Sequence, residues 1–224
     1  MKHKILAAII IYFVSLTVSF AQTQLHPTVL FIDPQSRSGE MRVRNTSQEA
    51  RELEIEARFG YQAYDEYGNP YLEYEDSVNA DKYSLKPYLK IFPKKLMLPP
   101  GESQVVRYLI TNASQMKDRT YWARIFFISS PMAKQIDTLS DKVSAQIIVK
   151  TEIVGLAIFQ KGNVKAGTDV EYKTAVVDSS NVYLVIEKKK TGNSPFWGSM
   201  FLEFYNDEDD KVYEMEKKLA TVEM

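Results

Sequence analysis

Few side chains in this 224-residue chain can act as nucleophiles, redox groups or soft metal ligands. The sequence contains no cysteine and only two histidines, His3 and His26. Two histidines make a histidine-based catalytic triad or a multi-histidine metal site nearly impossible. The absence of cysteine excludes cysteine nucleophiles and thiolate metal sites. Disulfides and a cysteine-linked lipid anchor are excluded for the same reason.

The densest group of carboxylates is residues 206–210, Asn-Asp-Glu-Asp-Asp. A calcium loop needs alternating ligands and a glycine turn, which this run lacks, so a solvated hairpin tip is the simpler interpretation. No two acidic residues stand out as a buried catalytic pair, and the nine glycines form no phosphate-binding loop. We therefore expect a protein that is not an enzyme and needs no metal or cofactor.

A row of alternating residues near residue 150 is a candidate for binding a partner. The row occupies every second position from 147 to 153 and consists of Ile147, Val149, Thr151 and Ile153. In a strand these side chains share one face, while Lys150 and Glu152 point the other way. From the residues alone two interpretations stay open. The one favoured without further information is the core-facing side of an ordinary strand, and the alternative is a row that fits into a partner protein by strand addition.

A second group that suits recognition is tyrosine, since seven of the fourteen tyrosines lie between residues 61 and 88. Tyrosine is amphipathic and loses little entropy on ordering, so clusters of it occur at binding surfaces. Tyrosines also line the half-exposed faces of hairpins, and residues 65–70 have the composition of a hairpin turn. We favour the structural role for this group.

The first 21 residues are predicted to be a signal peptide. They combine the basic residues Lys2 and Lys4, an apolar run over residues 5–20, and small residues before a cleavage site after Ala21. The run is shorter than the roughly 20 apolar residues of a membrane-spanning helix, which makes an uncleaved anchor the weaker alternative. We expect an exported protein, and its formal net charge of −1 does not favour nucleic-acid binding.

The rest of the chain has the pattern of short strands separated by turn residues. Residues 52–59 alternate between charged and apolar side chains, which is typical of a half-buried antiparallel strand. Helical periodicity is weak, and its best case, residues 214–219, is too short to predict a helix. Further strands are predicted at residues 29–32, 41–44, 89–92, 94–98, 104–110, 121–128, 144–159, 170–177, 182–188 and 200–205, with a weaker candidate at 211–217.

This pattern predicts an all-β fold with two Ig-like antiparallel β-sandwich domains. A seam at residues 161–163 divides residues 22–161 from residues 162–224. The second part has about four strands, whereas an Ig-type sandwich needs about seven. The second domain is therefore expected to be incomplete.

Several segments, in order, resemble the PapD-like periplasmic chaperones that assemble pili. Residues 93–107 resemble the family pattern P-x-x-x-x-L-x-P-G-x-x-Q-x-x-R, and residues 98–107 are the most specific part of the resemblance. Residues 41–47 resemble its V-x-V-x-N-x-S second strand. Weaker similarity covers residues 29–31, 121–125, 153–159 and 192–198, so the resemblance extends over about residues 27–205.

The resemblance implies a periplasmic chaperone. Members of the family hold a pilin-like subunit that lacks one strand, and their own long last strand fills the gap, a case of strand addition. In this chain the strand would present Ile147, Val149, Thr151 and Ile153 to the client. The family also implies an outer-membrane usher as a partner, and neither nucleic acid nor a small-molecule cofactor.

One feature of the family is not preserved. Its members hold the terminal carboxylate of the pilin with an arginine in the first strand and a lysine in the last. These two positions fall at Thr28 and Ala157, and neither residue can bind an anion by charge. Their loss favours a different class of function, an exported Ig-like structural or adhesive module that binds a surface partner. The alternating row and residues 98–107 favour the chaperone.

Overall fold

The computed structural model describes residues 22–65, 69–132, 149–177, 179 and 182–221. The predicted signal peptide and Ile147 lie outside the described residues. In the part that is described, no helix is both long and apolar enough to cross a membrane. The predicted all-β class is confirmed, because strands dominate and the described α-helix has only seven residues.

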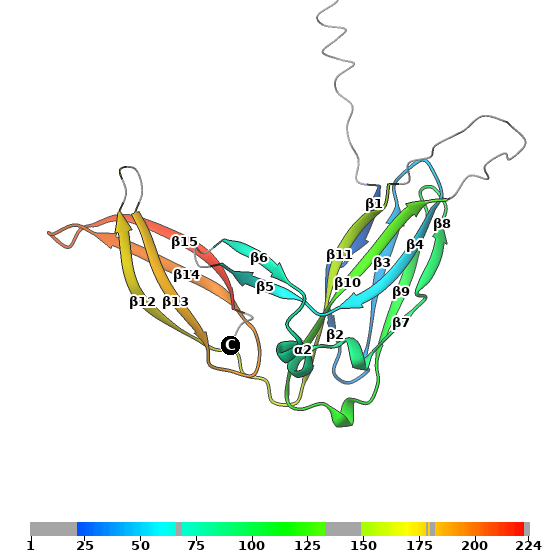
Figure 1. Ribbon diagram of the computed structural model, residues 1–224, viewed down its shortest axis with the longest axis horizontal. Helices are drawn as coiled ribbons and strands as arrows, with labels where there is room; N and C mark the ends of the chain where they lie inside the picture. Colours follow the sequence, from blue (N-terminus) through cyan, green and yellow to red (C-terminus); the bar gives the residue numbers. More distant parts are fainter. Residues whose placement is uncertain (1–21, 66–68, 133–148, 178, 180–181, 222–224) are drawn as a thin grey trace, which may run out of the picture.

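Residues 22–161 form a sandwich of two sheets, called here the N-terminal sandwich (Figure 1). One sheet has the order β1-β3-β9-β7, with strands at Thr23–His26, Ser38–Asn45, Ser103–Ile110 and Leu89–Phe92. The other has the order β2-β11-β10-β4-β8, with strands at Val29–Ile32, Thr151–Lys161, Arg119–Pro131, Arg51–Arg58 and Lys95–Leu98. The β2–β11 pair is parallel, whereas the other pairs within these two sheets are antiparallel.

Period-two alternation in the sequence places one face of each strand in a common core. Leu53 and Ile55 of β4 and Ile125 and Phe127 of β10 are all buried between the sheets. Burial of side chains of this size stabilises a fold by about 1.5–3 kcal/mol each. The glutamates that alternate with the apolar residues of β4 lie on the outer face, which is why that strand keeps a charged side.

The hydrogen bonds of the Asn45 side chain explain why β3 ends in an asparagine. Its side chain is fully buried, and its Nδ2 donates to the carbonyls of Glu49 and Leu98, each at 2.8 Å. Its Oδ1 accepts from the Ser47 backbone N–H at 3.0 Å. The Asn45 carbonyl accepts from Gly101, whose positive φ of 75° favours glycine in this turn. The two sequence motifs at residues 41–47 and 93–107 therefore meet at one end of the sandwich.

The sequence prediction of no helix is wrong for one segment. Helix α2, Ser77–Tyr83, follows the hairpin of β5, Tyr61–Tyr64, and β6, Pro70–Glu73. Asp76 caps the helix by accepting from the Asn79 N–H at 2.9 Å, and this bond lowers the pKa of Asp76. Tyr61 also donates to Asp76, at 2.6 Å. The helix forms through this cap and through the burial of Tyr83, neither of which produces a long periodic pattern. Two 3₁₀ turns, Lys86–Tyr88 and Ala113–Gln115, complete the non-strand elements described.

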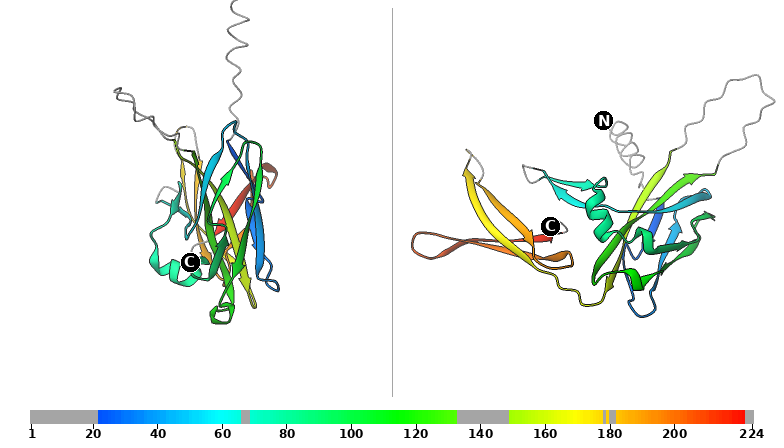
Figure 2. Two further views of the ribbon diagram at one scale, coloured as in Figure 1. Left: turned by 90° about the vertical axis from the view of Figure 1, so that its right-hand side faces the viewer. Right: turned by 60° about the horizontal axis from the view of Figure 1, so that its bottom comes forward.

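The C-terminal part consists of two antiparallel two-stranded ribbons. The first pairs β12, Thr168–Val177, with β13, Val182–Lys190, and the second pairs β14, Phe196–Tyr205, with β15, Lys211–Thr221. Figure 2 shows the ribbons as a separate arm beside the sandwich. Their apolar side chains are half-buried, as at Leu184, Ile186 and Met200, or exposed, as at Val182 and Phe201. The four predicted strands are thus present, and the division into two domains stays a prediction.

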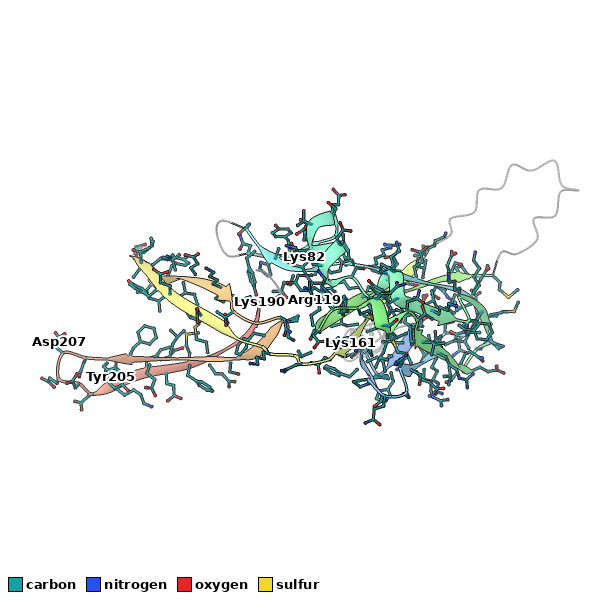
Figure 3. All side chains as sticks on the ribbon, turned by 90° about the horizontal axis from the view of Figure 1, so that it is seen from below. Lys82, Arg119, Lys161, Lys190, Tyr205 and Asp207 are labelled. Atoms are coloured by element: carbon teal, nitrogen blue, oxygen red, sulfur yellow. The ribbon has the colours of Figure 1, made fainter. Side chains whose placement is uncertain are left out.

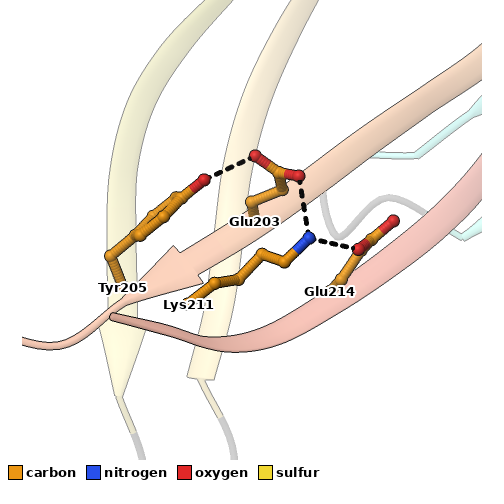
Figure 4. Close-up of polar contacts among 4 residues, drawn as sticks. All are labelled: Glu203, Tyr205, Lys211 and Glu214. Carbon is orange, nitrogen blue, oxygen red and sulfur yellow. Dashed lines mark hydrogen bonds and ion pairs between the residues drawn. The ribbon is translucent and has the colours of Figure 1, made fainter. Parts of the chain in front are cut away.

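Four polar side chains contact one another near the turn of the second ribbon: Glu203, Tyr205, Lys211 and Glu214 (Figure 4). Lys211 Nζ lies 2.7 Å from Glu214 Oε2 and 3.3 Å from Glu203 Oε1. The Tyr205 hydroxyl donates to Glu203 at 2.8 Å and lowers the pKa of that carboxyl. All four side chains are exposed to solvent, so these contacts contribute little to stability.

The core contains one hydroxyl group whose removal we expect to be tolerated. Tyr108 is buried in the sandwich, and within the described part of the chain its Oη has no hydrogen-bond partner. An unpaired buried hydroxyl costs about 1–3 kcal/mol, so Tyr108→Phe should leave the free energy of unfolding unchanged or raise it by about 1 kcal/mol. Urea denaturation measures this.

The matched control is Tyr121→Phe. The Tyr121 hydroxyl accepts from the Lys117 N–H at 2.9 Å and donates to the Lys117 carbonyl at 3.3 Å. Its loss should lower the free energy of unfolding by about 0.5–1.5 kcal/mol. A larger destabilisation by Tyr108→Phe than by Tyr121→Phe would show that the Tyr108 hydroxyl is satisfied.

Candidate functional site: the open edge of β11

Strand β11 is paired along its whole length on one side and only partly on the other. Residues 151–161 pair with residues 119–129 of β10. On the opposite side β2 pairs only with residues 156–159 of β11. Among the described residues, no strand pairs with this side of residues 151–155. We call this side the open edge of β11; it lies at the upper end of the sandwich in Figure 1.

The direction of the backbone groups at the open edge follows from one hydrogen bond. The Leu156 N–H donates to the Thr28 carbonyl at 2.8 Å, on the side of β11 that faces away from β10. Backbone groups alternate between the two sides of a strand, so Glu152 and Val154 also point away from β10. Their N–H and C=O groups are available to another strand, as at any unpaired sheet edge.

Three members of the predicted row are described, Val149, Thr151 and Ile153, and they lie at or just before this edge. Thr151 and Ile153 pair with Ser129 and Phe127 of β10, and Phe127 lies in the core, so this face of β11 turns toward the sandwich interior. Ile153 is half-buried and Thr151 exposed, while Val149, just before the strand, is 65% exposed. The row therefore belongs to the edge of a core, where its side chains are only partly covered.

Gly155 marks the place where the open edge ends. A Cβ atom there would lie 2.9 Å from Leu25 Cδ2, 3.2 Å from the Thr28 carbonyl and 3.3 Å from Met41 Cε. The chain approaches β11 this closely because it leaves β1 in one sheet and enters β2 in the other between His26 and Val29. This crossing covers the β2 side of the lower half of β11, and among the described residues the same side of the upper half has no partner strand.

The two family anchor positions have different surroundings. Thr28 is exposed, and its carbonyl is engaged with Leu156. Ala157 is fully buried in the core, so a lysine there would place its stem between the sheets. The structure gives neither position a charged group.

The outer face of β10 and β11 is covered over its lower half. A second cluster of buried residues lies there under α2 and the β5–β6 hairpin, consisting of Phe59, Tyr61, Ala63, Tyr83, Trp122 and Ile158. Trp122 stacks on Tyr83 with ring centroids 5.4 Å apart and donates to the Gly60 carbonyl at 3.1 Å. Several of the clustered tyrosines thus have the structural role that the sequence favoured. Val154, beyond this cover, stays exposed.

The junction between the sandwich and the ribbons is held by specific contacts. Lys190 of β13 is buried, donates to the Tyr83 hydroxyl at 3.1 Å and lies 4.2 Å from the centre of its ring. Arg119 packs over the same ring, and Figure 3 shows Lys82, Arg119, Lys161 and Lys190 gathered at this junction. The Asn193 side chain donates to the carbonyls of Asp118 and Asn163. The turn between β13 and β14, which contains Asn193, therefore fastens the ribbons to the sandwich.

The carboxylate run at residues 206–210 forms the turn between β14 and β15. The Asn206 side-chain oxygen accepts from the N–H groups of Glu208 and Asp210, at 3.0 and 2.8 Å. In the described part of the chain, no three acidic or histidine side chains gather as metal ligands. The open edge of β11 is thus the feature with the clearest capacity to bind a partner.

No family model matches the chain, and no curated relative matches it by sequence. Among solved structures, it is similar to a chain from a chaperone–tip adhesin complex of CFA/I fimbriae biogenesis, with 16% identity and a TM-score of 0.51 over 90% of this chain and 86% of that one. The class 5 fimbriae chaperone CfaA gives 15% identity, coverage of 89% and 80%, and a TM-score of 0.46. A chain of the CsuC–CsuE chaperone–tip adhesion subunit complex of Acinetobacter baumannii has 11% identity and a TM-score of 0.44, over 90% of this chain and 89% of that one. The expected resemblance to the PapD-like chaperones is confirmed at the level of the fold.

Proposed function

We propose that this protein is an exported periplasmic chaperone that binds a pilin-like subunit lacking one strand, and that the client pairs with the open edge of β11. The proposal rests on the open edge itself. A strand with one paired side and one unpaired side accepts a further strand through main-chain hydrogen bonds, and alternate side chains add specificity. The similarity in fold to a chain of a chaperone–tip adhesin complex supports the class of partner.

In this proposal the two kinds of group on β11 have different tasks. Glu152 and Val154 supply backbone N–H and C=O groups to the client strand. The row of Val149, Thr151 and Ile153, continued by Ile147 outside the described residues, supplies side chains to the client core. Each unpaired client backbone group that finds a partner here avoids a desolvation cost of about 1–3 kcal/mol. Such a chaperone acts by binding alone, and delivery to an outer-membrane usher completes its proposed role.

The second candidate is an exported Ig-like structural or adhesive module. The uncharged residues Thr28 and Ala157 favour it, because the family's carboxylate anchor has no counterpart at those positions. This module would bind a folded surface partner and would have no need of an unpaired strand edge beside a partly covered apolar row. The open edge therefore favours the chaperone.

Co-purification from a periplasmic extract separates the two candidates. The tagged full chain should bring down one small protein in a 1:1 complex, and that protein should unfold or aggregate when it is released. Recovery of a partner that stays folded and monomeric after release would support the adhesive module. Recovery of no partner from cells that assemble fimbriae would contradict the chaperone.

A further inference from the structure

We propose that Arg51, a buried arginine of β4, is a positioning residue that holds the first residues of β11 in place and so preforms the open edge. This inference rests on the proposed function for its biological meaning. The structural part, the tethering of β11, stands on the contacts of Arg51 alone.

The Arg51 side chain spans three neighbouring strands on the core side of their sheet. It starts on β4, and its Nε donates to Ser129 Oγ of β10 at 2.9 Å. Its Nη2 donates to the Ser129 carbonyl at 3.2 Å and to Thr151 Oγ1 of β11 at 3.1 Å. Thr23 of β1, in the opposite sheet, donates to Ser129 Oγ at 3.4 Å. One guanidinium group therefore links the first residue of β11 to the rest of the sandwich.

This arrangement is not explained by stability alone. Arg51 is only 5% exposed, and all the partners it has among the described residues are neutral oxygens. Burying a charge is costly, and apolar side chains of similar size are often equally or more stabilising at such positions. What the planar guanidinium provides, and an apolar side chain does not, is hydrogen bonds in fixed directions to two adjacent strands.

The first residues of β11 need such a tether. Before Leu156, the described strands bond to β11 on one side only, and strand ends with few bonds open most readily. If these residues frayed, a client would have to order them on binding, and that entropy would be subtracted from its affinity. The tether also explains why Thr151, a polar residue, interrupts an otherwise apolar row: its hydroxyl is the acceptor that Arg51 uses.

Amide hydrogen exchange of the full chain tests the tether. In Arg51→Met, the amides of Thr151 and Ile153, which point toward β10, should exchange at least tenfold faster than in the wild type. The exchange rates of the Ala157 and Phe159 amides, in the part of β11 that also pairs with β2, should be unchanged. The urea midpoint should be unchanged too. The control is Arg42→Met, at an exposed position of β3, which should change none of these values. Arg51→Lys keeps the charge but lacks the two-pronged geometry, so it should behave like Arg51→Met.

Two results would overturn the inference: unchanged exchange at Thr151 and Ile153, or faster exchange spread evenly over β10 and β11 with a lower urea midpoint. Should Arg51→Met not fold, the same exchange rates are measured on Arg51→Lys and on Thr151→Val, which removes only the acceptor.

Client capture by the variants is a separate test. Equal capture by wild type and Arg51→Met contradicts the positioning role, whereas no capture by the wild type contradicts the proposed function and leaves the exchange result to decide on Arg51.

Discussion

Glu152→Pro should weaken client capture on the order of 100-fold, because it alters the open edge and nothing in the core. The Glu152 N–H points away from β10, so proline at this position removes no bond between β10 and β11. It does remove a donor that the client strand would use, and its ring occupies the space of that hydrogen. One unpaired client carbonyl costs about 1–3 kcal/mol, and 2.8 kcal/mol corresponds to about 100-fold in affinity.

Glu152→Ala is the matched control, since it removes the same carboxylate and keeps the N–H group. It should capture the client as the wild type does, within about threefold, because the Glu152 side chain is exposed on the outer face. Capture is measured as the amount of co-purified subunit per tagged chain, and by titration once that subunit is isolated. Equal capture by Glu152→Pro and Glu152→Ala would show that backbone pairing at this edge is not used.

The largest loss of stability is expected from Phe127→Ala. Phe127 is fully buried in the sandwich core and lies opposite Ile153. Truncating a buried phenylalanine costs about 3–5 kcal/mol, which is much of the 5–15 kcal/mol typical of a folded protein. The loss removes the support beneath the apolar row, so capture should fail together with folding.

Phe92→Ala provides the comparison for the same change of residue type. Phe92 is 73% exposed on β7, and its truncation should alter the free energy of unfolding by less than about 0.5 kcal/mol. Urea denaturation of both variants measures the difference. Similar effects at the two positions would mean that the core of the sandwich is not organised around β10.

Period-two alternation was enough to predict most strands, because one side of each sheet is buried. The alternation of residues 52–59 predicted β4, and the turn residues around Gly101 predicted where β8 ends and β9 begins. Helix α2 was missed because it has only seven residues and depends on an aspartate cap and on tyrosines that pack at long range. Strand β1 was missed because its four residues, Thr23–His26, are too few to show a period.

The candidate site could be predicted only in part. The alternating row from Ile147 to Ile153 was visible in the sequence, and so was the absence of charge at Thr28 and Ala157. The open edge was not, because it depends on how few residues of β2 pair with β11. The buried Arg51 was not visible either, since its meaning lies in contacts with Ser129 and Thr151, 78 and 100 residues away. Long-range pairing of this kind leaves no local pattern.

The central claim is that the client pairs with the open edge of β11, and amide exchange at Glu152 and Val154 tests it most directly. Both N–H groups point away from β10, so they should exchange rapidly in the free protein. In the isolated complex both should exchange at least tenfold more slowly, while Ile153, already bonded to β10, changes little. Rapid exchange at both residues in a stoichiometric complex would contradict the claim and place the client elsewhere on the protein.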